Sequence, residues 1–292
     1  MEKMNGILMV NAFLDSPQTN EIYRWLMESA KRNNINMVLK NTGEYMADLI
    51  DGKVIPNVPA ADFVLFWNKD VALGEALEEN GLRLFNRAEA IKLCDNKAFT
   101  HKALSGIVDM PKTLKVPMTF KGINYTNYDF LSTLEDYLGY PFVIKECWGS
   151  YGGQVYLAHN KEEAISIFDS VEGTECIAQE FISKHSGRDL RVYVVGDEVV
   201  AAMERRNPND FRANITNGGQ SLPYKITDEQ AQMAIAATKA LGLDFGGVDL
   251  LFLENDKPIL CEVNSNAQFK GLYNATGINI ADSIFQYIKK KI

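Results

Sequence analysis

The sequence predicts a mixed fold, with a parallel α/β domain at the N-terminal end and an α+β remainder built around antiparallel hairpins. Apolar runs at 7–10 and 63–67 flank a helix-like segment at 21–33, the alternation typical of a parallel βαβ unit. Three later pairs of apolar runs are each separated by a glycine-rich or polar turn, which is typical of antiparallel hairpins. We expect the α/β domain to cover residues 1–85.

The helices between these strands have recognisable start signals. The expected caps are Asn86 with Glu89, Asp95, Asn160 with Glu163, Thr227 with Gln230, and Asn279 with Asp282. The helix that Asp95 begins should run to Leu104, and the last helix should end in a solvated lysine run at 289–291.

Composition and charge exclude several classes of protein. The chain has 292 residues, of which 46% are hydrophobic and 23% charged, so it is long and apolar enough for a globular core. Its net charge of −8 argues against binding to nucleic acid or to a membrane surface. No apolar run reaches the length of a membrane helix and the start does not resemble a signal peptide, so we expect a cytoplasmic protein.

Cysteine and histidine offer no recognisable catalytic or zinc motif. Cys94, Cys147, Cys176 and Cys261 form no close pair and are expected to be buried thiols. His101, His159 and His185 lack metal-ligand spacing and are expected to be structural or solvent-facing.

The third hairpin, with strands at 248–253 and 258–263, predicts a metal site. If Asn255 and Asp256 form a two-residue loop, Asp249 lies opposite Glu262, and Asn264 shares the face of Glu262. Facing carboxylates repel each other, and a divalent cation with oxygen ligands, Mg²⁺ above all, removes that repulsion. The alternative is an accidental pair of exposed acids, which the apolar neighbours of both residues disfavour.

The first hairpin, with strands at 141–147 and 154–158, places Lys145 in an apolar strand before a glycine-rich loop at 149–153. A lysine beside glycines can bind phosphate, because glycine lets backbone N–H groups approach an anion. The loop matches neither a Walker A nor a Rossmann motif, and a plain flexible hairpin is an equally good interpretation.

The second hairpin, with strands at 190–195 and 199–203, lies in a region rich in arginine. Five of the nine arginines are Arg188, Arg191, Arg205, Arg206 and Arg212. By alternation Asp189 and Arg191 share a face, and Arg205 points away from Arg206. Some of these arginines could be surface ion pairs, but arginine also grips carboxylate or phosphate in a bidentate manner. Together the three hairpins suggest an ATP-dependent enzyme with an anionic second substrate.

From about Phe85 to the C-terminus the chain resembles ATP-grasp carboxylate–amine ligases of the type that adds glutamate to ribosomal protein S6. It is also similar to LysX-type ligases, which act on an amino-group carrier protein. The motifs that carry the resemblance, in order, are CDNK at 94–97, PFVIK at 141–145, GSYGG at 149–153, QEFI at 179–182, GRDLR at 187–191, ERR at 204–206, DFRAN at 210–214, GVD at 247–249 and EVN at 262–264.

The resemblance implies an ATP-grasp fold with a central subdomain at 86–184 and a C-terminal subdomain at 185–292. It also implies a role for each matching residue. The ATP phosphates would be bound by Lys97, Lys145 and the loop Gly149, Ser150, Tyr151, Gly152 and Gly153. The adenine would be bound by Gln179, Glu180, Phe181 and Ile182, and the ribose by Asp189. Arg212 and Asn214 would line the reacting phosphate, Arg205 and Arg191 would face the acyl-phosphate or substrate carboxylate, and Asp249, Glu262 and Asn264 would bind Mg²⁺ or Mn²⁺.

The implied reaction is amide formation through an acyl-phosphate, with ATP converted to ADP. The expected partners are an amino acid such as glutamate and an acidic peptide, protein or carrier, and a homo-oligomer is compatible with the resemblance. A LysX-like ligase on a carrier or peptide natural product and a non-catalytic ATP-binding regulatory module are the alternatives.

The segment 265–270 departs from the glutamate-adding pattern, because Phe269 and Lys270 are closer to the LysX type. We expect this segment to form a wall of the substrate site, with Lys270 as a cation and Phe269 as an apolar surface. The alternative is that Lys270 points to solvent.

Overall fold

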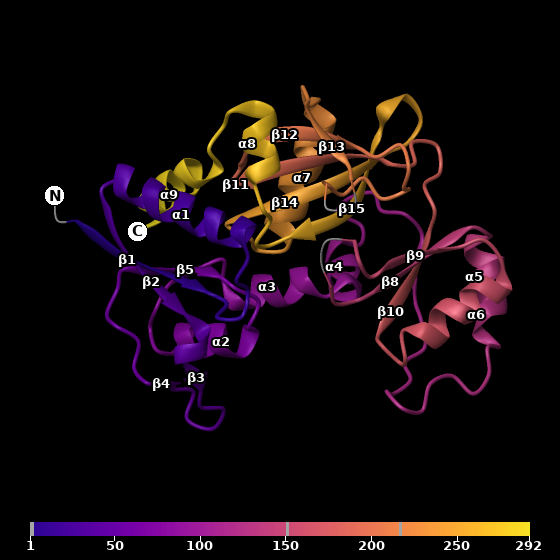
Figure 1. The fold of residues 1–292 in the computed structure, drawn as a ribbon, viewed down its shortest axis with the longest axis horizontal. Helices are drawn as coiled ribbons and strands as arrows, with labels where there is room; N and C mark the ends of the chain where they lie inside the picture. Colours follow the sequence, from indigo (N-terminus) through magenta and orange to yellow (C-terminus); the bar gives the residue numbers. More distant parts are fainter. Residues whose placement is uncertain (1–2, 150–151, 216–217) are drawn as a thin grey trace.

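The computed structural model describes residues 3–149, 152–215 and 218–292. An N-terminal lobe and a central lobe lie on either side of the view in Figure 1, and the C-terminal sheet lies between and above them. Within the described residues, no helix combines the length and the apolar character needed to cross a membrane.

The N-terminal lobe contains a parallel four-stranded sheet in the order β2-β1-β5-β6. Its elements are β1 (Met4–Val10), α1 (Pro17–Arg32), β2 (Ile35–Asn41), η1 (Thr42–Glu44), β3 (Met46–Ala47), β4 (Val54–Ile55), β5 (Phe63–Trp67), α2 (Val71–Glu79) and β6 (Leu84–Phe85). The predicted parallel pairing of 7–10 with 63–67 is therefore confirmed as β1 with β5, but α1 connects β1 to β2, an edge strand that was not predicted.

The central lobe contains an antiparallel sheet in the order β7-β10-β8-β9, with α5 and α6 packed on it (Figure 1). Two helices, α3 (Ala88–Asp95) and α4 (Lys97–Leu104), connect it to the N-terminal lobe. The other elements are β7 (Thr113–Lys115), α5 (Phe130–Leu138), β8 (Phe142–Glu146), β9 (Val155–Ala158), α6 (Lys161–Ser170) and β10 (Cys176–Glu180).

The C-terminal part is a five-stranded antiparallel sheet in the order β13-β12-β11-β14-β15. Its elements are β11 (Arg188–Val195), β12 (Glu198–Arg206), β13 (Gln220–Pro223), α7 (Asp228–Ala240), β14 (Phe245–Phe252), η3 (Glu254–Asp256), β15 (Pro258–Asn264), α8 (Lys270–Thr276) and α9 (Ile280–Lys291). All three predicted hairpins are confirmed as antiparallel pairs: β8 with β9, β11 with β12, and β14 with β15.

Helix α9 leaves the C-terminal sheet and packs beside α1 (Figure 1). Asp282 at its start binds the hydroxyl of Ser29 and accepts a hydrogen bond from Arg32 Nη2 at 2.9 Å. One buried cluster combines Leu26 of α1, Trp67 of β5 and Phe285 of α9. The first 85 residues therefore share their core with the end of the chain.

Two of the predicted helix starts are wrong, and the other three are confirmed. Asn160, Thr227 and Asn279 cap α6, α7 and α9, and Thr227 forms the full capping box with Gln230. Asn86 does not cap α3, because its buried side chain is bonded to the backbone of 244–245 and 265. Asn96, not Asp95, caps α4.

Candidate active site

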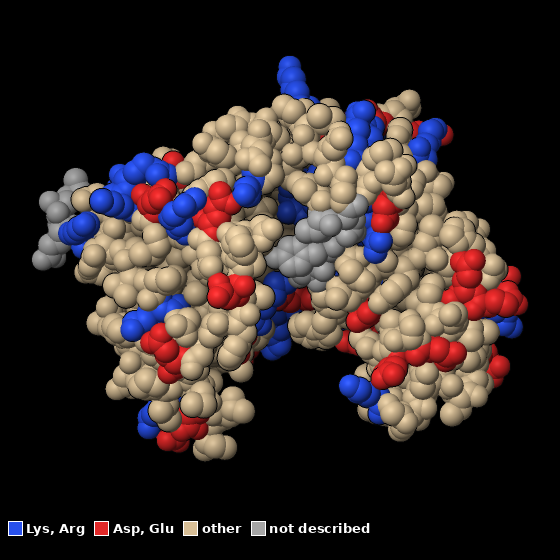
Figure 2. Space-filling view, in the orientation of Figure 1, with Lys and Arg blue, Asp and Glu red and all other residues tan. Residues whose placement is uncertain are grey.

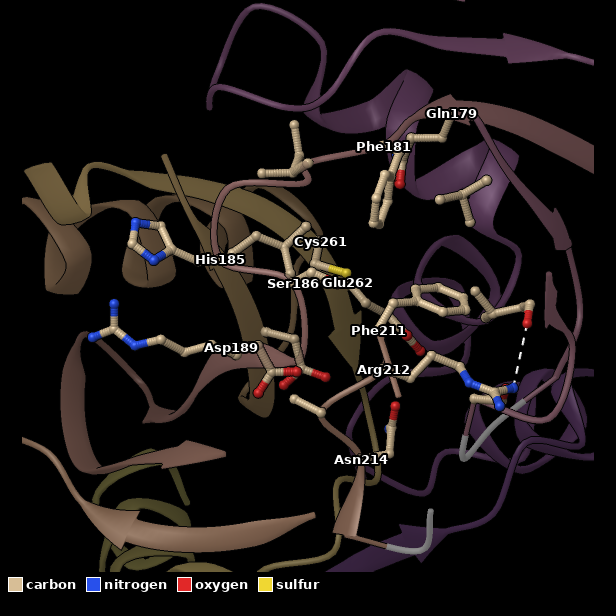
Figure 3. A pocket seen from close by; sticks show the side chains of 18 of the residues that line it. Gln179, Phe181, His185, Ser186, Asp189, Phe211, Arg212, Asn214, Cys261 and Glu262 are labelled. Atoms are coloured by element: carbon tan, nitrogen blue, oxygen red, sulfur yellow. Dashed lines mark hydrogen bonds between the residues drawn. The ribbon is translucent and has the colours of Figure 1, made fainter. Parts of the chain in front are cut away.

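A narrow cleft, here called the first cavity, lies between the central sheet and the C-terminal sheet (Figure 3). The residues predicted to bind nucleotide that line it are Lys145, Gly152, Gln179, Glu180, Phe181, Ile182 and Asp189. Its open space is about 90 Å³, below the range of roughly 300–1,000 Å³ for small-molecule pockets.

A second cavity of about 480 Å³ lies between the C-terminal sheet and the N-terminal lobe, which contributes Gln18 and Lys69 to its lining. The two cavities share the residues Arg205, Asn214, Asp249 and Glu262. These four shared residues, here called the seam, are all residues predicted to be catalytic or to bind metal. In the view of Figure 2, basic and acidic side chains meet in the recess between the N-terminal lobe and the central lobe.

The predicted pairing of Asp249 with Glu262 is confirmed, although the route to it differs from the prediction. The turn is three residues long, since Glu254–Asp256 form η3, and it pairs Phe252 with Pro258. This shifts the register by one residue relative to a two-residue loop. A bulge between Asp249 and Leu250 restores it, so Asp249 still faces Glu262.

Asp249 is held by two arginines. It binds the Nε atom of Arg191, and its Oδ2 atom accepts from Arg191 Nη2 at 2.8 Å and lies 3.0 Å from Arg205 Nη2. Burial alone would raise the pKa of Asp249, but the two guanidinium groups outweigh it and lower the pKa. Arg205 also grips Asp189 through two bonds of 2.6 Å, so two arginines and two aspartates form a buried, charge-balanced network.

Glu262 and Asn264 are in a different environment. Neither side chain has a hydrogen bond or ion pair in the described part of the chain, and both line the second cavity. They are two residues apart on β15 and therefore share a face beside Asp249. Two carboxylates and an amide give the all-oxygen donor set that suits Mg²⁺. The described residues contain no group of three or more His, Cys, Asp or Glu side chains placed to hold a metal ion, so a metal here would depend on the Asn264 amide.

Lys145 is a lysine that was predicted to bind a nucleotide phosphate, and it lines the first cavity. It is buried on β8, and its Nζ is 3.8 Å from Cys261 Sγ. The glycine-rich loop begins next to it, and Gly152 reaches the cavity lining. Ser150 and Tyr151 lie outside the described residues. Lys97 donates to the carbonyl of Gly149 at 3.4 Å and so supports the base of this loop.

Arg212 supports the same loop from the other side. Its guanidinium binds Asp210 and donates to the carbonyl of Gly152 at 2.9 Å. In Figure 3 its side chain points away from Asp189. Arg212 lines the cavity as predicted, but its donors are directed to Asp210 and the loop backbone. Asn214, two residues later, lines both cavities at the seam.

His101 and Phe211 contribute to the site although they were not predicted to do so. Gln179 Nε2 lies 2.8 Å from His101 Nε2, and His101 Nδ1 lies 2.8 Å from the carbonyl of Lys97. Burial, aided by the charge of Lys145, lowers the pKa of His101 to about 4, so the ring is neutral and can accept from Gln179 while donating to Lys97. Phe211 packs edge-on against Phe181, with ring centroids 6.0 Å apart (Figure 3).

The expectation for the segment 265–270 is half right. Lys270 lines the second cavity as predicted, and it is ion-paired with Glu21 of α1. Phe269 does not form an apolar wall of the site, because it is fully buried against Trp67 and Tyr193. It anchors the segment between the N-terminal lobe and the C-terminal sheet.

Comparison with known proteins gives a consistent family. A model of the RimK-like ATP-grasp domain matches residues 95–288. A probable alpha-L-glutamate ligase 1 from Hahella chejuensis is 34% identical over 257 residues, covering 86% of this chain and 81% of that protein. An uncharacterized MG012 homolog from Mycoplasma pneumoniae is 32% identical over 224 residues, covering 74% and 77%.

Solved structures share the fold at low sequence identity. A RimK domain ATP-grasp protein from Sphaerobacter thermophilus has a TM-score of 0.73 at 18% identity, covering 97% of this chain and 98% of that chain. D-alanine–D-alanine ligase from Bacillus anthracis, complexed with ATP, has a TM-score of 0.73 at 18% identity over 98% and 96%. The ATP-grasp ligase PsnB, complexed with a minimal precursor, has a TM-score of 0.72 at 17% identity over the full length of both chains.

Proposed function

The chain belongs to the RimK-like ATP-grasp family, and on that premise we propose that it joins glutamate, or another amino acid, to a carboxylate of an acidic peptide or protein. It is an ATP-grasp ligase, and the family forms amide bonds. The relatives named as probable glutamate ligases support glutamate as the amine. The non-catalytic regulatory module is therefore set aside.

The observation that carries the proposal is the seam shared by the two cavities. A phosphoryl group bound in the first cavity and a carboxylate bound in the second would meet at Arg205, Asn214, Asp249 and Glu262. The second cavity is also rich in amides, which can bond to both the N–H and the C=O of a peptide. These amides are Gln18, Asn214, Asn264, Asn266, Gln268 and Asn274.

In this proposal the residues of the chain position groups and balance charge rather than form covalent intermediates. Lys145 and the glycine-rich loop hold the phosphates, while Glu262, Asn264 and Asp249 would hold Mg²⁺. Bound there, Mg²⁺ would neutralise phosphate charge. The acceptor carboxylate oxygen forms a bond to the γ-phosphorus as the bond to ADP breaks, and the amine nitrogen then displaces phosphate from the acyl-phosphate carbon.

The test is an ADP-release assay that crosses the common amino acids with acidic peptides, followed by mass spectrometry of the peptide. We expect ADP to form only when both substrates are present, with a mass gain equal to one amino acid residue. A Glu262→Gln variant, prepared in parallel, identifies ADP formed by contaminants. ADP formation without a mass gain on any peptide would contradict the proposed acceptor class.

A further inference from the structure

The side-chain amide of Gln179 has hydrogen bonds at its nitrogen only. Gln179 belongs to β10, is only 2% exposed, and lines the first cavity together with Phe181 (Figure 3). Its Nε2 atom lies 2.8 Å from His101 Nε2 and donates to Thr113 Oγ1 at 2.9 Å. Within the described part of the chain its Oε1 atom has no hydrogen-bond partner. Both N–H groups of this buried amide are therefore in use, and its acceptor is not.

His101 can only accept from this amide. Its Nδ1 atom lies 2.8 Å from the carbonyl of Lys97, and a carbonyl oxygen only accepts, so Nδ1 carries the proton. Burial, aided by the charge of Lys145, lowers the pKa of His101 to about 4, so at neutral pH the ring is uncharged and Nε2 keeps its lone pair. That lone pair attracts an N–H of Gln179 and repels the amide oxygen.

Thr113 imposes the same orientation on the amide from β7. Its hydroxyl donates to the carbonyl of Pro111 at 2.8 Å, which uses its one proton. The Thr113 oxygen can therefore only accept from Gln179. Two main-chain carbonyls, those of Lys97 and Pro111, thus determine which way the amide faces, and they act through His101 and Thr113. The Oε1 atom is left for the first cavity before any nucleotide binds.

An open acceptor at this place distinguishes the two purine bases by their chemistry. Adenine carries an amino group, a donor, where guanine carries a carbonyl oxygen, an acceptor. The adenine amino group can donate to Gln179 Oε1. The guanine oxygen would instead face a second acceptor, and both oxygens would lose their hydrogen bonds to water without replacement.

We propose that His101 and Thr113 are positioning residues that fix the amide of Gln179, so that Oε1 accepts from the adenine amino group and the site selects ATP over GTP. The assignment rests on the function proposed above, which places a nucleotide in the first cavity. His101 is not among the described residues that line this cavity, so its effect on the base passes through Gln179.

The experiment is isothermal titration of the full chain with the β,γ-imido analogues of ATP and GTP in the presence of Mg²⁺. Selectivity is the Kd for the GTP analogue divided by the Kd for the ATP analogue. We expect it to fall at least about fivefold in His101→Leu and in Gln179→Leu, as for the loss of one hydrogen bond. The double variant His101→Leu/Gln179→Leu should lose no more than Gln179→Leu alone, because the two residues act as one unit.

Three further variants separate positioning from packing. His101→Gln should keep most of the selectivity, since its amide oxygen can replace Nε2 as the acceptor. Thr113→Val removes the second acceptor and should also lower selectivity, and it decides the question if His101→Leu does not fold in a urea titration. His159→Leu changes an exposed histidine of the central lobe, serves as the matched control and should behave as wild type.

A purely structural role for His101 would weaken the binding of both analogues by the same factor, and unchanged selectivity in His101→Leu or Thr113→Val overturns the assignment. Losses that multiply in the double variant overturn it as well, because His101 would then act independently of Gln179. A wild type that binds both analogues equally does the same. The titration needs no acceptor, so failure to find acceptor-dependent ADP formation contradicts the proposed function and leaves the outcome for His101 distinct.

Discussion

Asp249 and Glu262 face each other across β14 and β15, yet only Asp249 is bound by arginines. Glu262 has no hydrogen bond or ion pair in the described part of the chain. The same pair of acids therefore combines a carboxylate held by two arginines with one that has no such partner, so substitution of Asp249 should mainly lower stability and substitution of Glu262 should mainly lower activity.

Glu262→Gln should reduce ADP formation by about 100-fold or more, because it removes a negative charge from the expected metal and phosphate site. The free energy of unfolding should change by less than about 0.5 kcal/mol, since no internal partner is lost. Steady-state rates over a range of Mg²⁺ concentrations measure the effect. Glu254→Gln, in the turn of the same hairpin, is the matched control. Wild-type activity in Glu262→Gln would remove this residue from the site.

Asp249→Asn should destabilise the fold by about 3–5 kcal/mol, because it leaves the buried guanidinium groups of Arg191 and Arg205 with too little negative charge. Urea unfolding of this variant beside Glu262→Gln gives the comparison. Equal stability of the two variants would show that the arginines do not depend on Asp249.

Lys145→Ala should weaken ATP binding by about 10- to 100-fold, as expected for a charge-assisted hydrogen bond of roughly 1.5–3 kcal/mol. Isothermal titration with a non-hydrolysable ATP analogue measures it directly. Lys115→Ala changes a lysine of β7 in the same sheet, paired with Glu175, and should bind normally. An affinity of Lys145→Ala within about twofold of wild type counts against a phosphate-binding role.

Folding stability should depend on pH through His101. Its pKa is about 4 in the folded protein and 6.5 when unperturbed, so the unfolded chain binds the extra proton between these values. The neutral ring therefore makes its full contribution to the free energy of unfolding above pH 6.5. This contribution is lost as pH falls toward 4, by up to about 1.4 kcal/mol per pH unit. Urea unfolding at pH 5 and pH 7 should show a smaller difference in His101→Gln than in wild type.

The exposed His159 provides the control for this pH dependence. His159→Gln alters an exposed ring bound to Glu163 on the surface of the central lobe. It should retain the wild-type difference between the two pH values. Loss of that difference in both variants alike would mean that another group controls it.

Alternation and polar caps predicted much of the fold, because they depend on residues close in sequence. The three hairpins, the parallel N-terminal sheet and the caps at Asn160, Thr227 and Asn279 follow from such local patterns. A two-residue turn predicted that Asp249 lies opposite Glu262. A longer turn and a bulge produce the same pairing, and the sequence contains no local signal that reveals either one.

Features that depend on distant contacts could not be predicted. Asn86 has the local pattern of a helix cap, but four hydrogen bonds to the backbone of 244–245 and 265 determine its role. Phe269 follows the strand that carries the predicted metal ligands and was expected at the site, yet the aromatic groups that bury it come from β5 and β11. Lys69 lies far from every motif, and only the packing of the N-terminal lobe brings it to the second cavity.

The return of α9 to α1 also has a consequence for the order in which the protein forms during synthesis. Domains generally fold as units, the N-terminal one first. Here Ile284, Phe285 and Ile288 of α9 complete the core of the N-terminal lobe, although they are translated long after its sheet. The apolar face of α1 stays uncovered until α9 has been translated. A nascent chain halted before residue 280 should therefore recruit chaperones through its N-terminal lobe, although all strands of that lobe's sheet have already been translated.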